Sequence, residues 1–373
     1  MKNIFFKSFI SMSLLFLSSC HFPAKMAIEG EGGRNAYNIE VQRTNAEEML
    51  LNLVRLRYFD SPLFLEVSTV TASFLFRNTA SASIPIPGFN KLNPLLLGGE
   101  SQWQSQPTIQ YSPLEGQEFA SQLMNPLDAA TLQQVIYSGW EINRVFQLAV
   151  QDLKDFHNFS KEGYINKDQI EKYEDFYKSI QLMTDLQKKG CLKVGIIVNK
   201  KNDEKDIKTE IQNQSLQIAF PCDINESKEV ASLLDIKEEK NGRYIAHFAQ
   251  GFDENGNVGI MPRSILSCMY YLANAVHVPK EDIDSKKAFD IPAHISSSKI
   301  IQDLFKGLLN VCYSYNKPKD YYLCVKYRNK YFYIQDNDLN SKRTFMLLLE
   351  LYNLQSGRRR EKGPILTLPI GVG

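Results

Sequence analysis

Hydrophobic residues recur every three or four positions through much of residues 44–190, which is the spacing of amphipathic helices. A first helix is predicted over 44–58, because Thr44 and Glu47 match a capping box at its start. Four more helices are predicted over 114–125, 127–137, 140–159 and 166–190. This part of the chain is therefore expected to be mainly helical.

The pattern changes between the first and second of these helices. Residues 63–76 are rich in Val, Thr, Phe and Leu and predict a long strand or a bent hairpin. Residues 80–112 are rich in Ser, Pro, Gly, Asn and Gln and predict a long irregular loop. Because this loop also carries Leu95, Leu96, Leu97 and Trp103, we expect it to pack against this protein or against a partner.

Short strands become the dominant pattern after Gly190. Strands are predicted over 191–199 and 215–221, followed by a short helix over 225–234. Asn255-Gly256 lies between two further strand patterns, 244–252 and 258–260, and predicts a hairpin turn.

Aromatic and aliphatic residues alternate with polar ones in 309–315 and 321–327, and a tight turn at 328–330 leads into a third strand. The predicted result is a meander in which Val311 lies opposite Val325. A helix predicted over 340–357 is apolar nearly all round, so we expect it to be buried. The fold class is therefore predicted to be α+β: a helical N-terminal part packed on a mixed sheet with antiparallel hairpins, with a buried C-terminal helix.

Four regions follow from these patterns. Residues 1–19 are expected to be a signal peptide, and residues 20–43, which include Gly30-Glu31-Gly32-Gly33, a flexible tether. Residues 44–190 form the mainly helical region and residues 191–373 the α+β region.

The balance of charge excludes one class of partner. The chain has 43 basic and 42 acidic residues, a net charge of +1. Loss of residues 1–19 removes Lys2 and Lys7 and no acid, which leaves −1. No electrostatic basis for nucleic-acid binding follows from such a balance.

The first twenty residues have the order of a bacterial export signal. Lys2 and Lys7 precede an apolar stretch over 9–16 that is short for a membrane span, and Leu17-Ser18-Ser19-Cys20 follows it. This segment resembles the lipobox of bacterial lipoprotein precursors. The resemblance implies that Cys20 becomes the first residue and carries lipid; several acyl chains, each worth about 0.8 kcal/mol per buried CH₂, give stable anchoring. The alternative is an ordinary signal peptide with an incidental cysteine.

Location follows from the same resemblance. Residue 21 is His rather than the aspartate that commonly favours inner-membrane retention, which implies an outer-membrane anchor with the globular part in the periplasm. Three stretches of the mature chain, 44–67, 116–142 and 338–369, resemble an uncharacterised family of proteobacterial lipoproteins. That resemblance implies no activity.

An oxidising compartment permits disulfides among the five cysteines besides Cys20. The predicted meander places Cys312 opposite Cys324, which makes this the favoured pair. The strands before it bring Cys191 near Cys222, which gives a second possible pair. Cys268 is then the remaining cysteine. The alternative is that these thiols stay reduced.

Familiar catalytic patterns are missing from the sequence. There is no Gly-x-Ser-x-Gly, His-Glu-x-x-His, phosphate-binding loop or Cys-x-x-Cys, and the five histidines show no metal-ligand spacing. We therefore predict no catalytic residues, metal or cofactor, and favour a non-enzymatic interaction or assembly component of the cell envelope, with envelope proteins as possible partners. The alternatives are a periplasmic hydrolase whose site is not visible in the sequence, and a lipid- or glycan-binding module.

Overall fold

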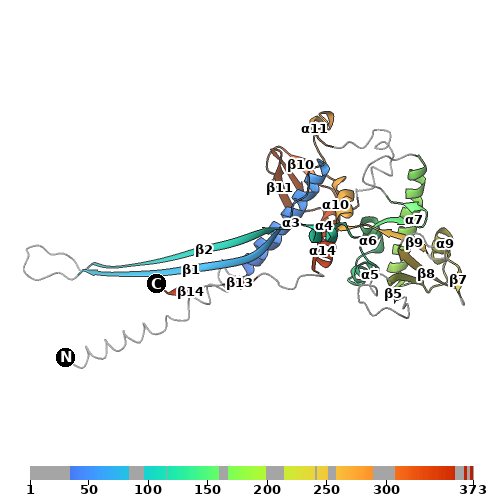
Figure 1. Ribbon diagram of the computed structural model, residues 1–373, viewed down its shortest axis with the longest axis horizontal. Coiled ribbons are helices and arrows are strands. Elements are labelled where there is room, and N and C mark those ends of the chain that lie inside the picture. The colour runs from blue at the N-terminus through green and yellow to red at the C-terminus, as the bar shows by residue number, and fades with distance from the viewer. Residues whose placement is uncertain are drawn as a thin grey trace, which may run out of the picture. The chain divides into compact units, whose positions relative to one another are not determined.

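A computed structural model of the chain shows an α+β fold (Figure 1). The described residues are 34–83, 96–114, 116–158, 167–198, 214–239, 242–250, 258–288, 307–357, 365–367 and 370–372. They divide into two compact units. The first contains the start of helix α3 (Arg34–Arg57) and a ribbon of long strands, and the second contains the end of α3 and the remaining helices and sheets.

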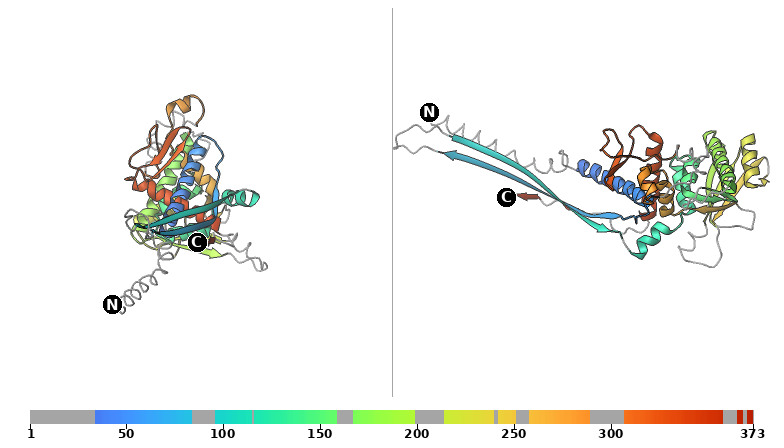
Figure 2. Two further views of the ribbon diagram at one scale, coloured as in Figure 1. Left: turned by 90° about the vertical axis from the view of Figure 1, so that its left-hand side faces the viewer. Right: turned by 90° about the horizontal axis from the view of Figure 1, so that it is seen from above.

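A long antiparallel ribbon is the main feature of the first unit. Its strands β1 (Leu65–Ser83) and β2 (Leu96–Pro113) pair along their whole length, and Figure 2 shows the ribbon twisting. At about 3.3 Å per residue, β1 is roughly 60 Å long. Two short strands, β13 (Ile365–Thr367) and β14 (Ile370–Val372), pair in parallel with the other side of β1. The irregular loop predicted over 80–112 is therefore wrong for residues 96–112, which form a regular strand.

The second unit is built on a seven-stranded mixed sheet. Its strands are β3 (Val150–Leu153), β4 (Phe156–His157), β5 (Lys193–Val198), β6 (Gln214–Phe220), β7 (Glu238–Glu239), β8 (Arg243–Gln250) and β9 (Val258–Pro262). The order is β4-β3-β9-β8-β6-β5, and β7 pairs with β8. The predicted hairpin at Asn255-Gly256 is wrong, because β8 and β9 pair in parallel, and a two-residue turn joins only antiparallel strands.

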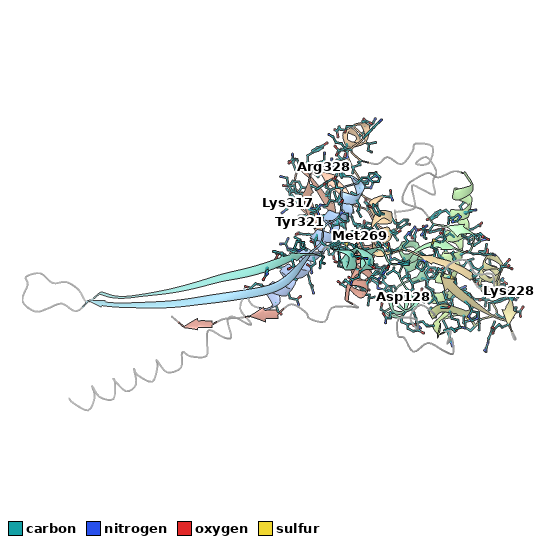
Figure 3. All side chains as sticks on the ribbon, in the orientation of Figure 1. Asp128, Lys228, Met269, Lys317, Tyr321 and Arg328 are labelled. Carbon is teal, nitrogen blue, oxygen red and sulfur yellow. A yellow bond between two sulfur atoms is a disulfide. The ribbon has the colours of Figure 1, made fainter. Side chains whose placement is uncertain are left out.

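Besides α3 and α14 (Leu339–Gly357), seven helices are described in the second unit, and α5, α6 and α7 contact this sheet. They are α4 (Gln117–Met124), α5 (Ala129–Tyr137), α6 (Ile142–Ala149), α7 (Lys167–Lys188), α9 (Asn225–Leu234), α10 (Ile265–Ala273) and α11 (Lys280–Asp284). Helix α5 packs on β5 and β6, while α7 contacts both α6 and α9. The Asp128 carboxylate caps α5 by accepting a hydrogen bond from the Thr131 amide (Figure 3). Phe146 of α6 meets Phe248 of β8 edge to face, and both are fully buried.

A buried arginine marks the place where α6 becomes β3. Arg263 is 2 % exposed, and its guanidinium donates to the carbonyls of Gln147 and Leu148, at 2.9 and 3.1 Å. These carbonyls lie in the last turn of α6, where helices leave acceptors unsatisfied. The helix predicted over 140–159 therefore ends at Ala149, because a residue distant in the sequence supplies the donors.

A third sheet, also in the second unit, has the order β10-β12-β11. Its strands are β10 (Cys312–Ser314), β11 (Leu323–Tyr327) and β12 (Lys330–Ile334). The turn from β11 to β12 forms as predicted, with positive φ at Arg328 and Asn329. The predicted meander order is wrong, because β12 lies between β10 and β11, and Val311 is therefore not paired with Val325.

The last helix, α14 (Leu339–Gly357), is buried as predicted: Phe345, Leu347, Leu348 and Leu351 are fully inaccessible. At its start the Asp338 carboxylate accepts hydrogen bonds from the amide and hydroxyl of Ser341. The capping box predicted at Thr44 is wrong, since α3 already begins at Arg34 and the Thr44 hydroxyl donates to the Glu40 carbonyl within the helix. Residues 34–43 of the predicted tether are thus helical, and Gly190 lies inside the second unit.

Candidate functional site

Cys20, the predicted lipidation site, lies outside the described residues. The other predicted site residues are cysteines of the second unit. Cys191 and Cys222 form a disulfide that links the chain just after α7 to the chain just after β6. This is the second of the two pairs that the sequence suggested.

Cys312 and Cys324, the favoured pair, are free thiols, so that prediction is wrong. Both residues lie opposite Tyr333, one on each side of the central strand β12. Two strand spacings separate them, roughly 9.6 Å. A disulfide needs Cα atoms about 4.4–6.8 Å apart. Burial raises the pKa of both thiols above the usual value, which makes them less reactive.

Tyr58, Asp282 and Lys330 form a buried polar cluster. The Tyr58 hydroxyl donates to Asp282 Oδ2 at 2.6 Å, and Lys330 Nζ lies 2.9 Å from the same oxygen. The side chains of Asp282 and Lys330 are 8 % and 14 % exposed. Burial opposes ionisation of Asp282, but the hydrogen bonds from Tyr58 and Lys330 outweigh it and lower the pKa. Burial, and then the bond to Asp282, raises the pKa of Tyr58 well above its usual range.

A second cluster adjoins the first. Tyr327 and Arg328 both donate to the Asp60 carboxylate, and the Arg328 guanidinium lies 4.6 Å from the centre of the Tyr58 ring. The hydrogen bond from Tyr327, together with Arg328, lowers the pKa of Asp60. In both clusters the carboxylate accepts hydrogen bonds from a tyrosine and from a basic side chain of the same cluster. Their evident effect is to tie the chain after α3 to α11 and to the β11–β12 turn.

His157 and Asp152 face each other across the β3–β4 hairpin. The Nδ1 atom of His157 lies 2.6 Å from Asp152 Oδ1, and the histidine side chain is 43 % exposed. A carboxylate on Nδ1 is the arrangement that orients a histidine base. No residue in the described ranges hydrogen-bonds to Nε2. The Asp152 carboxylate can therefore orient the His157 ring, but no nucleophile is bonded to that ring in the described part of the chain.

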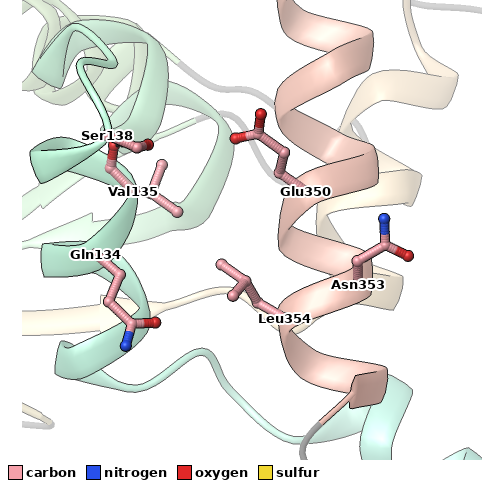
Figure 4. Close-up of a pocket in the computed structure, with 6 residues that line it drawn as sticks. All are labelled: Gln134, Val135, Ser138, Glu350, Asn353 and Leu354. Carbon is pink, nitrogen blue, oxygen red and sulfur yellow. Dashed lines mark hydrogen bonds between the residues drawn. The ribbon is translucent and has the colours of Figure 1, made fainter.

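An open groove of about 620 Å³ lies between α5 and α14 (Figure 4). Figure 4 shows Gln134 and Ser138 on one wall, and Glu350, Asn353 and Leu354 on the other. Glu350 Oε2 accepts a hydrogen bond from the Trp140 indole at 2.7 Å. The lining of this groove is mainly apolar, and a few polar groups stand among the apolar ones.

The side of β2 that faces away from β1 is a candidate interaction surface. Between Leu96 and Tyr111, β2 pairs only with β1 among the described strands, whereas β1 also carries β13 and β14. Sequence reasoning missed this surface. A period-two signal was available, because Gln102, Gln104, Gln106 and Gln110 alternate with Trp103, Ile109 and Tyr111.

Comparisons with protein-family models, with curated proteins and with solved structures found no match to this chain. In the described part of the chain, no helix is both long and apolar enough to cross a membrane. Nor do His, Cys, Asp or Glu residues gather there in groups of three or more that could hold a metal ion.

Proposed function

We propose that this protein is a lipoprotein anchored through Cys20 in the outer membrane, facing the periplasm, where it acts as a non-catalytic assembly component of the envelope. Within the described strands, the edge of β2 that faces away from β1 has no partner from Leu96 to Tyr111, and this edge carries the proposal. It offers a row of backbone donors and acceptors to another chain, which is how strands recruit partners by β-augmentation.

Two sequence features support the rest of the proposal. The order of Lys2, Lys7, an apolar stretch and Leu17-Ser18-Ser19-Cys20 matches a lipoprotein signal. The Cys191–Cys222 disulfide fits an oxidising compartment, since such bonds are rare in the cytosol.

Replacement of the anchoring cysteine tests the location. We expect Cys20→Ser to release the protein from membranes washed with high salt, because the acyl chains are lost, while the folded chain keeps its melting temperature. Cys312→Ser is the matched control and should fractionate like the parent. Retention of the Cys20→Ser protein in washed membranes would contradict the anchor.

The assembly role has its own test. Crosslinking in intact cells, followed by purification of the full chain, should yield discrete larger species. A protein that is recovered solely as a monomer, and that also hydrolyses an envelope substrate, would favour the hydrolase alternative.

A further inference from the structure

We infer that the outward face of the third sheet binds acidic polysaccharides, that is, chains of sugar rings that carry carboxylates. Tyr331 and Tyr333 of β12 form the centre of this face, and Lys317 and Lys326 supply positive charge beside it. Such binding goes beyond the proposed assembly role and does not involve the β2 edge, which belongs to the first unit.

Strand register determines which residues share the outward face. Two rows of directly opposed residues cross the sheet: Cys312, Tyr333 and Cys324 in the first row, and Ser314, Tyr331 and Lys326 in the second. Directly opposed residues project from the same face of a sheet, and all six are at least partly exposed. The alternate residues form the core face and are buried: Leu323, Val325, Phe332 and Ile334. The two tyrosines therefore lie on the face that is turned away from the core.

Short side chains flank the two tyrosine rings. Three of their four cross-strand neighbours are Cys or Ser, which are too small to cover an aromatic ring. A tyrosine has an apolar ring and a polar hydroxyl, so it can pack against the C–H groups of a sugar and hydrogen-bond to its hydroxyls. Because Tyr331 and Tyr333 are two positions apart on one strand, roughly 7 Å separates their Cα atoms, and one oligosaccharide can contact both.

Two lysines provide positive charge at this face. Lys326 Nζ lies 5.7 Å from the centre of the Tyr331 ring, and Lys317 Nζ lies 5.5 Å from the centre of the Tyr321 ring. Cys324 and Tyr331 also act electrostatically on Lys317, which places this lysine beside the outward face. No carboxylate in the described ranges forms an ion pair with either lysine. Both ammonium groups can therefore pair with an anion from outside the chain.

Two acids, Asp338 and Glu47, lie close enough to the cysteines of the first row to act on them electrostatically. The Asp338 carboxylate already accepts two hydrogen bonds from Ser341. The second row has a lysine instead of an acid. The carboxylates of a bound chain are therefore expected at the second row, beside Tyr331 and Lys326.

The residue types of the outward face favour a glycan over other polymers. Lysine is depleted in protein–protein interfaces, and none of the six residues in the two rows is aliphatic. Nucleic-acid binding typically uses roughly six to ten phosphate contacts, many more than two lysines supply. Phosphates are often held by arginine or by several converging amides, and neither row contains arginine. Separate lysines suit the single charge of a carboxylate.

Three polymers test this inference. Polygalacturonate has sugar rings and carboxylates, polyglutamate has carboxylates without sugar rings, and dextran has sugar rings without charge. The full chain, extracted from membranes in a non-ionic detergent, is titrated with each polymer in a calorimeter. We expect polygalacturonate to bind about fivefold or more tightly than either of the others, because it alone engages both the tyrosines and the lysines.

Tyrosine variants test the stacking contacts. Tyr331→Ala and Tyr333→Ala should each weaken binding of polygalacturonate about fivefold, because a ring that packs against the sugar is lost. Tyr315→Ala is the matched control, since Tyr315 is exposed but lies outside the two rows, and it should bind like the parent. Melting temperatures show whether each variant is folded.

Lysine variants test the charge contacts and leave the sheet intact, because both side chains are exposed. Lys317→Gln and Lys326→Gln should each weaken binding about threefold at low salt and reduce the loss of affinity that added salt causes. Lys237→Gln, which removes an exposed charge next to the seven-stranded sheet, is the matched control and should have no effect.

Three outcomes would overturn the inference. Polyglutamate that binds as tightly as polygalacturonate would show a surface for an acidic protein segment. Dextran that binds as tightly would show that the lysines have no role, and a lack of binding to polygalacturonate would show that the face is not a glycan site. None of these results bears on the Cys20 fractionation or on crosslinking in cells, which test the proposed function separately.

Discussion

At the scale of residues, buried charges in the second unit are placed where backbone or side-chain partners already exist. Arg263 satisfies the open carbonyls of α6, and Lys330 neutralises Asp282. Removal of one member of such a pair leaves its partner buried without compensation, which costs more than the interaction itself is worth. These positions should therefore be sensitive to substitution although none lies in a catalytic arrangement.

Asp282→Asn should lower the free energy of unfolding by about 2 kcal/mol at pH 7, because Lys330 loses its counter-charge. The folded-state pKa of Asp282 lies below the unfolded value, so its stabilisation is complete above about pH 4 and is lost as pH falls through the folded pKa. The difference between variant and parent should therefore shrink in acid.

Urea denaturation between pH 3 and pH 7 measures this difference. Asp284→Asn, on the same helix but exposed, is the matched control and should change stability by less than about 0.5 kcal/mol. A difference between Asp282→Asn and the parent that stays constant across the range would contradict the linkage.

At the scale of elements, one covalent bond joins the helical and sheet parts of the second unit. The Cys191–Cys222 disulfide closes a loop with a sequence separation of 31, from the end of α7 to the end of β6. It limits the freedom of the unfolded chain between helix α7 and strand β6, which lies next to the edge of the sheet. The free thiols of the third sheet have no such role.

The double variant Cys191→Ser/Cys222→Ser should lose about 3.5 kcal/mol of stability, from the loop-closure entropy of a bond with this separation. Chemical denaturation with and without reductant checks the effect. Reductant should destabilise the parent and the Cys312→Ser control, and leave the double variant unchanged. Equal sensitivity of all three proteins to reductant would contradict the assignment.

At the scale of the whole molecule, the two compact units are held together internally in different ways. The second has a continuous apolar core around its seven-stranded sheet, with Phe146, Phe176, Phe220 and Phe248 fully buried. The first is dominated by backbone pairing along β1 and β2. A unit with its own core is expected to keep its fold when the ribbon is shortened.

Replacement of residues 72–107 by Asn-Gly would close the ribbon between Thr71 and Thr108, which lie opposite each other. We expect the melting temperature of the second unit to shift by less than about 3 °C, since 1 kcal/mol corresponds to roughly 2–4 °C in a domain of this size.

A shorter replacement of residues 80–99 by Asn-Gly is the graded control, because Thr79 and Glu100 also lie opposite each other, and it should shift the melting temperature no more than the longer one. Calorimetry gives the readout. Loss of the Cys191–Cys222 disulfide or of cooperative melting in the long deletion would contradict the independence of the second unit.

Local patterns predicted the elements whose signals lie within a few consecutive residues. Helices α5, α7, α9 and α14, strands β5 and β6, and the tight turn at Arg328 and Asn329 follow from apolar periodicity, capping and turn chemistry. The lipobox at Cys20 is a local signal of the same kind and stays a prediction.

The pairing of strands was decided only by the tertiary structure. The alternation of apolar and polar residues was consistent with a pairing of Cys312 with Cys324. In the structure β12 lies between β10 and β11 and separates the two cysteines. The parallel pairing of β8 with β9, and the end of α6 at donors from Arg263, likewise depend on residues distant in the sequence. Alternation sets which face a residue takes, whereas the choice of neighbouring strand depends on the packing of the whole chain, and no short stretch of sequence contains that information.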